Sequence, residues 1–104
     1  MRYQVEFTQI AFDEFAHLTE KVQGKLSLVI GALSDEPRPR GARKITGLDD
    51  CYRIRYGDYR LIYAVIDEYL VVLIVRAGHR KDVYENMSNL LKRIDRRRED
   101  ENQA

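Results

Sequence analysis

The fold is decided by the stretch Cys51-Tyr52-Arg53-Ile54-Arg55-Tyr56-Gly57-Asp58-Tyr59-Arg60-Leu61-Ile62-Tyr63. From Cys51 onward the side chains alternate with a period of two, which is typical of a β-strand. Gly57-Asp58 is a favourable two-residue hairpin turn. The stretch therefore predicts an antiparallel hairpin whose cross-strand pairs follow from the position of the turn: Tyr56 with Tyr59, Arg55 with Arg60, Ile54 with Leu61, and Arg53 with Ile62.

This pairing places three arginines on one face of the hairpin. Arg53 and Arg55 share a face because they are two residues apart, and Arg60 lies directly opposite Arg55. Like charges in that position destabilise a sheet by ~0.2–1 kcal/mol per pair. The guanidinium groups therefore either spread into solvent, with Asp49 or Asp50 neutralising one of them, or bind an anion. The other face is apolar enough to receive helices, and its residues are Tyr52, Ile54, Leu61 and Tyr63.

The sequence before the hairpin predicts a strand and a helical region. Residues 2–7 alternate as a strand does. Residues 15–33 carry apolar side chains at helical spacing, and a break near residues 19–21 would divide the region into a two-helix hairpin capped by Thr8 or Thr19. The apolar stripe consists of Phe15, Leu18, Val22, Leu26, Val29 and Leu33.

The sequence after the hairpin predicts a third strand and a last helix. Residues 67–69 turn the chain into residues 70–76, whose nearly continuous apolar run indicates burial on both faces. Asp82 and Glu85 form a capping box ahead of a helix that carries an apolar stripe from Val83 to Ile94. We therefore expect a single α+β domain over residues 1–94: an N-terminal strand, a two-helix hairpin, a three-stranded antiparallel meander and a C-terminal helix. The charged tail, residues 95–104, is expected to be frayed or disordered.

Length and composition limit the possible functions. The chain has 104 residues, of which 34% are charged and 44% hydrophobic, as in an ordinary globular domain. It contains no apolar run of ~18 residues and no signal-like N-terminal stretch, so we expect a cytoplasmic protein that does not enter a membrane. Cys51 cannot form an internal disulfide, and we interpret it as a buried packing residue. With His17 and His79 as the two histidines, we expect no metal site and no cofactor.

The net charge of +1 conceals a basic central region. Residues 38–81 carry ten basic and five acidic side chains, whereas residues 1–37 carry three basic and six acidic ones. Most of the central excess is arginine, whose planar fork of donors matches phosphate oxygens. The region is either a solvated basic face or a site for a polyanion such as RNA. Residues expected to contact RNA outside the arginine face are Arg43, Lys44, Tyr56, Tyr59, Arg76 and Lys81, with the tyrosines, including Tyr84, able to stack on bases.

Ribonuclease chemistry of this kind would need an acid–base group beside the arginines. The 2′-hydroxyl of RNA can act as the nucleophile if a base accepts its proton, an acid protonates the leaving 5′-oxygen, and positive charge stabilises the phosphorane. His79 is the residue near the cluster whose ordinary chemistry permits proton transfer near neutrality. Tyr84 is a possible acid or stacking group. The other interpretation of His79 is a loop residue that only forms hydrogen bonds.

The element order and two stretches of sequence resemble the RelE/ParE superfamily of toxins, on the RelE side. The stretches are residues 52–63 and residues 75–84, and the resemblance extends over residues 2–94. It implies a small α+β fold and an antitoxin encoded beside the toxin, with which it forms a hetero-oligomer. It also implies cleavage of mRNA in the ribosomal A site, with contacts to 16S rRNA, leaving a 2′,3′-cyclic phosphate and a 5′-hydroxyl.

The resemblance also assigns roles to individual positions. Arg53 and Arg55 match the paired basic sites of the family, and Arg60 matches its strand arginine. Arg80 matches the arginine after the glycine, and Tyr84 matches the tyrosine of the last helix. Some members carry lysine where this chain has Arg53 and Arg55, and an arginine does not give up its proton. We therefore expect His79 to be the general base, with Arg60 and Arg80 stabilising the phosphorane.

Two other functions remain open. ParE-type members share the fold but inhibit DNA gyrase, and they need no nucleolytic cluster. A non-catalytic RNA-binding member of the same fold is the second alternative, because arginine replaces lysine at positions 53 and 55.

Overall fold

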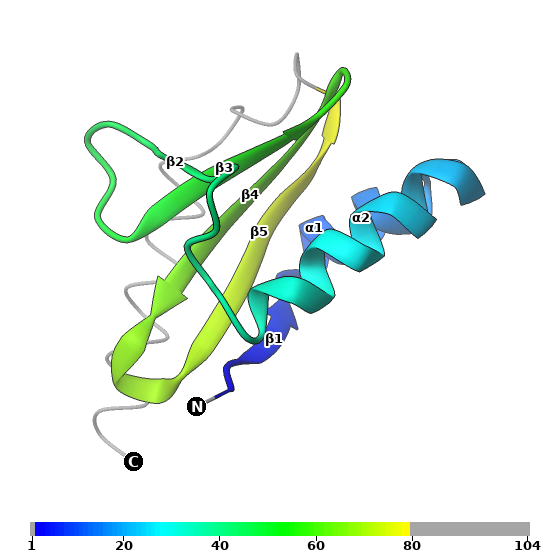
Figure 1. Cartoon of the computed structure of the whole chain (residues 1–104). Coiled ribbons are helices and arrows are strands. Elements are labelled where there is room, and N and C mark those ends of the chain that lie inside the picture. Colours follow the sequence, from blue (N-terminus) through cyan, green and yellow to red (C-terminus); the bar gives the residue numbers. More distant parts are fainter. Residues whose placement is uncertain (1, 80–104) are drawn as a thin grey trace.

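The computed structural model describes residues 2–79, and Figure 1 shows how they fold. A twisted sheet runs through the molecule, and two helices lie together beside it. This is the predicted α+β arrangement, whereas the predicted last helix and tail lie outside the described residues. The elements follow in the order β1 (Gln4–Phe7), α1 (Gln9–Ala16), α2 (Glu20–Leu33), β2 (Arg43–Lys44), β3 (Cys51–Tyr56), β4 (Tyr59–Ile66), the 3-10 helix η1 (Asp67–Tyr69) and β5 (Val71–His79).

Within residues 2–79 the strands form one five-stranded sheet in the order β1-β5-β4-β3-β2. β3, β4 and β5 make the predicted antiparallel meander. β1 joins it at one edge, parallel to β5, and β2 joins it at the other edge, antiparallel to β3. The sequence pattern does not predict β2, because two residues are too few to show a period.

The hairpin of β3 and β4 has the predicted register. All four predicted pairs are present, and Gly57 supplies the positive φ of 58° that this turn requires. The third strand is longer than predicted, since β5 continues to His79. Between Ile62 and Tyr63 of β4 the pairing with β5 passes over Val75, which forms a bulge.

Two threonines begin the two helices, as predicted. The Thr8 hydroxyl accepts a hydrogen bond from the Ala11 backbone N–H at 3.1 Å, and the Thr19 hydroxyl accepts one from that of Val22 at 3.3 Å. Each satisfies one of the donors that a helix start leaves free. The break between the helices lies at residues 17–19, slightly earlier than predicted.

The core has two parts, one on each face of the sheet. On one face, α1 and α2 pack on Ile54, Leu61 and Tyr63, which are the face predicted to receive helices. The buried side chains of α2 are Val22, Leu26, Ile30 and Leu33. The predicted stripe contained Val29 instead of Ile30, but Val29 is only partly buried. The other face carries a second buried cluster, consisting of Cys51, Ile62, Ala64, Ile66, Val71, Leu73 and Val75. β5 contributes to both clusters, so its predicted burial on both faces is confirmed.

Candidate nucleic-acid interface

Three arginines lie on one face of the β3–β4 hairpin, and a fourth, on β2, is paired with one of them. Arg55 is paired directly with Arg60, as predicted, and Arg53 lies two residues along β3 on the same side. The unpredicted strand β2 adds Arg43, which is paired with Arg53. The tertiary structure thus places like charges opposite each other at two cross-strand positions, an arrangement that costs free energy unless an anion is bound or solvent separates the groups.

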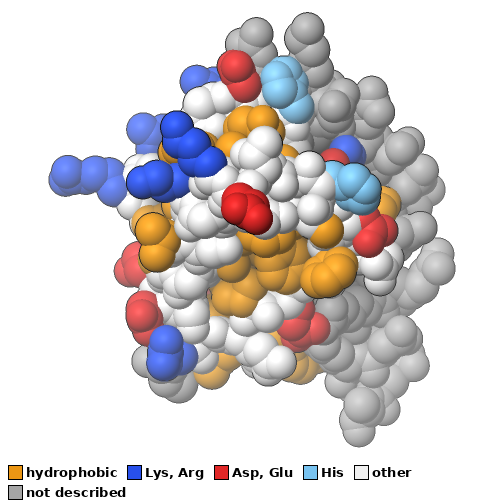
Figure 2. Space-filling view, turned by 90° about the vertical axis from the view of Figure 1, so that its right-hand side faces the viewer, with side chains coloured by type: hydrophobic (Ala, Val, Ile, Leu, Met, Phe, Trp, Pro, Cys, Tyr) orange, Lys and Arg blue, Asp and Glu red, His pale blue; other side chains and the backbone are white. Residues whose placement is uncertain are grey.

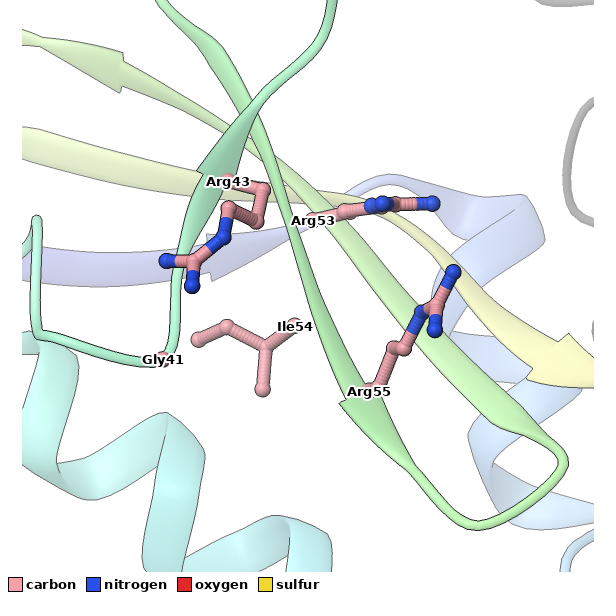
Figure 3. A pocket seen from close by; sticks show the side chains of 5 residues that line it. All are labelled: Gly41, Arg43, Arg53, Ile54 and Arg55. Atoms are coloured by element: carbon pink, nitrogen blue, oxygen red, sulfur yellow. The ribbon is translucent and has the colours of Figure 1, made fainter.

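Arg53 and Arg55 have no ion-pair partner within residues 2–79. The ion pairs in this part of the chain join Arg2 to Asp35, Arg38 to Asp67 and Arg76 to Glu14. Figure 3 shows both side chains leaving β3 on one side, while Ile54 leaves on the other. Their guanidinium groups can therefore bind an external anion without first breaking a salt bridge to a described residue. The sequence allowed Asp49 or Asp50 to neutralise one arginine of the hairpin, but neither aspartate takes part in these ion pairs.

Arg60 differs from these two because it is buried, with only 8% of the residue exposed. Its Nη1 donates hydrogen bonds of 3.0 Å to the backbone carbonyls of Gly57 and Tyr59, so the side chain is held against its own hairpin turn. Its Nε and Nη2 form no hydrogen bond with any residue in the described range. A fixed guanidinium with uncommitted donors is suited to stabilise charge that develops on a phosphate, because little reorganisation is needed when the charge appears.

Two hollows flank β2 and share Arg53. One, of about 260 Å³, is drawn in Figure 3 and is lined by Gly41, Arg43, Arg53, Ile54 and Arg55. The other, of about 240 Å³, is lined by Lys44, Ile45, Thr46 and Arg53. Within the first, Arg43 folds back so that its Nη1 donates to the carbonyls of Arg40 and Ala42. The predicted RNA contacts Arg43 and Lys44 therefore lie beside the arginine face, at the edge of the sheet.

Three other candidate residues lie on the opposite face. Tyr56 and Tyr59 pack against the helix-side core, and His79 is paired with Tyr59. The rings of Tyr59 and His79 meet edge to face, with their centroids 6.1 Å apart. Since Arg60 is the next residue after Tyr59, it projects from the other side of β4. The structure thus brings the arginines together but separates them from His79 and the two tyrosines, which meet at the end of the sheet.

Arg76 differs from the arginines of the hairpin because it is already held in an ion pair. Its Nε and Nη2 donate to the two carboxylate oxygens of Glu14 at 2.9 and 2.8 Å, and its side chain is only 9% exposed. This placement gives no support to the predicted RNA contact at Arg76. The remaining candidates, Arg80, Lys81 and Tyr84, lie outside the described residues.

Neither a metal-ligand cluster nor a membrane-spanning helix is found in the described residues. No group of three His, Cys, Asp or Glu side chains within residues 2–79 could hold a metal. No helix in this part of the chain is long and apolar enough to cross a bilayer.

Comparison with known proteins places this arginine-bearing fold in a family. Residues 5–84 match the family described as the ParE toxin of the type II toxin–antitoxin system, parDE. Over 98 residues the chain is 37% identical to the mRNA interferase toxin RelE of Escherichia coli K12, a match that covers 90% of this chain and 99% of that protein.

The chain belongs to the RelE/ParE superfamily of toxins. A RelE-like toxin protein of Escherichia coli is 36% identical over 96 residues, covering 88% of this chain and all of that protein. A double mutant of Escherichia coli RelE in the free state superposes with a TM-score of 0.75 at 33% identity, covering 90% of this chain and 99% of that one. The RelE chain of the intact Escherichia coli RelBE toxin–antitoxin complex gives a TM-score of 0.68 at 33% identity, covering 74% and 95%.

In this RelE/ParE chain a polar network supports the loop that leads into β2, and sequence reasoning did not find it. Arg38 donates through Nη1 and Nη2 to the Asp67 carboxylate and through Nε to the Tyr52 hydroxyl. The hydrogen bonds to Asp67 and Tyr52 raise the pKa of Arg38 further above its ordinary range. The buried Tyr63 hydroxyl donates to the Pro37 carbonyl at 2.8 Å, and burial raises the pKa of Tyr63. These contacts hold the start of the loop, at Pro37 and Arg38, against the far end of the meander.

The helix side of the RelE/ParE fold carries an apolar surface. Figure 2 shows hydrophobic side chains gathered in the middle of this side, while Lys and Arg side chains gather along one border. Phe12 is 57% exposed although its ring packs edge to face on Phe7. A hollow of about 390 Å³ lies beside these rings, lined by Val5, Phe7, Phe12, Phe15, Ser27, Ile30 and Gly31. This surface is chemically distinct from the arginine face.

Proposed function

We propose that this protein is the toxin of a toxin–antitoxin pair and that it cleaves mRNA in the ribosomal A site. The observation that carries the proposal is the arginine face: Arg60 is fixed and buried beside Arg55, and Arg53 and Arg55 are free of ion pairs within the described residues. The relatives named mRNA interferase RelE support the same activity. We place the protein in the cytoplasm, where ribosomes are found.

The proposed reaction is an attack by a 2′-hydroxyl of the message on its own adjacent phosphorus. The 2′-oxygen–phosphorus bond forms, the bond from phosphorus to the 5′-oxygen breaks, and the products are a 2′,3′-cyclic phosphate and a 5′-hydroxyl. A base accepts the 2′-hydroxyl proton, and an acid protonates the departing 5′-oxygen. Arg60 and Arg80 stabilise the phosphorane, while Arg53 and Arg55 hold the flanking backbone. The proposed reaction uses no metal, since the RNA supplies the nucleophile and the arginines supply the positive charge.

His79 is our candidate base, and Tyr84 our candidate acid or stacking group. His79 lies on the face opposite Arg60, so it reaches the substrate only at the end of the sheet, where β5 finishes. Replacing His79 by alanine should lower the cleavage rate, because the group proposed to accept the 2′-hydroxyl proton is then missing. A His79→Ala protein that cleaves at the wild-type rate would assign the base to another residue.

The test is primer extension on a defined message stalled on ribosomes. We expect cuts within the A-site codon from the wild-type protein, loss of these cuts with Arg55→Gln, and full cutting with Arg2→Gln. Arg2 is a suitable control because it is exposed and lies just before β1, which is the sheet edge opposite β2. Absence of cuts from folded wild-type protein would overturn the nuclease proposal.

A second candidate function, inhibition of DNA gyrase, is favoured by the match of residues 5–84 to the ParE toxin family. A gyrase supercoiling assay separates the two, since a ParE-type toxin stops supercoiling and leaves the message intact. If the protein neither cuts RNA nor inhibits gyrase, but binds RNA, the non-catalytic alternative holds.

We also propose a cognate antitoxin as the partner, because relatives have been solved as RelE–RelB complexes. An acidic antitoxin segment would cover the basic central region or displace the predicted last helix. Unchanged antitoxin affinity after Arg53→Glu and Arg55→Glu would exclude the first of these modes. Contacts with 16S rRNA would position the toxin on the ribosome, which a site with so few acid–base groups requires.

A further inference from the structure

Among the described residues, the end of β5 has no neighbouring strand on one side. β1 pairs with Val71–Ile74 and then ends at Phe7, so within residues 2–79 the rest of β5 has no strand beside it at this edge. These residues lead directly to His79 and to the sequence that contains Arg80. The position of this segment therefore matters for the proposed reaction.

Helix α1 takes the place of the missing strand. The Thr8 backbone N–H donates to the Ile74 carbonyl at 2.9 Å, and the Thr8 hydroxyl donates to the Val75 carbonyl at 3.0 Å. Farther along the helix, Glu14 Oε1 accepts a hydrogen bond from the Ala77 backbone N–H at 3.1 Å. The six residues from Thr8 to Glu14 advance about 9 Å in a helix, close to the roughly 10 Å covered by three strand residues from Ile74 to Ala77. The helix can therefore follow the strand edge.

The Glu14 carboxylate makes three hydrogen bonds at the bulge in β5. Besides the Ala77 N–H, it accepts from Nε and Nη2 of Arg76, and its own side chain is 21% exposed. A mostly buried ion pair of this kind is weak evidence for a gain in stability, since removing charges from water costs about as much as their attraction returns. It does fix geometry, because a two-pronged arginine–carboxylate contact has one favoured orientation.

The fixed segment leads into the residue of β5 that is paired with Arg60. Gly78, the residue after Ala77, is paired with Arg60 on β4, and the bulge at Val75 sets that register. A shift of Ala77 would therefore move Gly78 relative to Arg60 and move the start of the chain that carries Arg80. We propose that Glu14 is a positioning residue of the cleavage reaction, which acts by holding the Arg76–Ala77 segment of β5 in register with Arg60. This inference rests on the proposed nuclease function.

The test compares single-turnover cleavage on stalled ribosomes with ribosome affinity measured by co-sedimentation. The glutamine in Glu14→Gln cannot accept both hydrogen bonds from Arg76. The cleavage rate should therefore fall roughly 10- to 100-fold, as expected for a displaced catalytic group, while the affinity for the ribosome stays within about twofold of the wild type. Asp35→Asn, which removes a carboxylate from an exposed ion pair, should cleave at the wild-type rate. Circular dichroism verifies folding, and Glu14→Asp serves if Glu14→Gln does not fold.

A double-mutant cycle distinguishes positioning from a general loss of stability. If Glu14 acts through Arg60, adding Glu14→Gln to Arg60→Ala should lower the residual rate by no more than about twofold. Three results would overturn the inference. They are a double mutant whose loss of rate is the product of the two single losses, a wild-type rate in Glu14→Gln, and an equal loss of cleavage rate and ribosome affinity in Glu14→Gln. Wild-type protein in the same assay tests the nuclease function itself. If it does not cleave, both proposals are wrong. If it cleaves and Glu14→Gln cleaves equally well, only the positioning role of Glu14 is wrong.

Discussion

The arginine face makes a quantitative prediction about salt dependence. If Arg53 and Arg55 each contact an RNA phosphate, each releases counterions when RNA binds. The logarithm of the binding constant for single-stranded RNA then falls with the logarithm of salt concentration by about 0.7 for each contact. Replacing Arg53 by glutamine should make this slope shallower by about 0.7, and replacing both arginines by about 1.4. Both side chains contribute fully because neither is paired with an acid in the described residues.

The assay is fluorescence anisotropy of a labelled single-stranded RNA, titrated with protein at several salt concentrations. Arg53→Lys and Arg55→Lys should retain the wild-type slope, because lysine keeps the charge that displaces counterions. Arg2→Gln is the control for loss of a positive charge elsewhere, and its slope should match that of the wild type. If the double glutamine variant keeps the wild-type slope, the arginines do not contact phosphates and the assignment of this face to RNA is wrong.

Three further predictions concern stability. Arg55→Gln removes the like-charge pair with Arg60, so it should stabilise the protein by about 0.2–1 kcal/mol in a urea titration while lowering activity. A loss of stability would show that the two guanidinium groups do not repel each other. Tyr63→Phe leaves the buried Pro37 carbonyl without its donor and should cost about 1–3 kcal/mol. The pKa of Tyr63 is higher in the folded state than its ordinary value of 10.0. The stability that Tyr63 contributes is therefore complete below pH 10 and is lost as the pH rises above 10. Tyr63→Phe should accordingly weaken the decline of stability in alkali. Thr19→Ala removes an N-cap and should lower the melting temperature by an amount equivalent to about 1 kcal/mol, whereas Thr19→Ser should not.

Local patterns were sufficient to predict most elements. The turn at Gly57-Asp58 and the alternation that begins at Cys51 specify the hairpin register, since a slip of one residue would reverse its two faces. The same register places Arg55 opposite Arg60, because each lies one residue farther from the turn than the pair Tyr56 and Tyr59. Thr8 and Thr19 mark helix starts because their hydroxyls satisfy donors only a few residues away. All of these interactions join residues close together in the chain.

Other features of the site could not be predicted in this way. The parallel pairing of β1 with β5 joins residues 67 positions apart, for example Gln4 with Val71. The β2 strand, which brings Arg43 beside Arg53, is too short to leave a periodic signal. His79 was expected beside the arginines, but the register of β4 and β5 pairs it with Tyr59 on the other face.

The sequence by itself determined that this chain forms a hairpin with arginines on one face and an apolar surface on the other. Only the tertiary structure decided which basic residues remain available for an anion. Arg53 and Arg76 are both arginines in strands, but Arg76 lies where α1 brings the Glu14 carboxylate within 2.8 Å, and Arg53 meets no acid within the described residues. The difference depends on how a helix and a strand 62 residues apart in sequence pack together. That packing is set by the shared core of the whole domain, and no local pattern contains it.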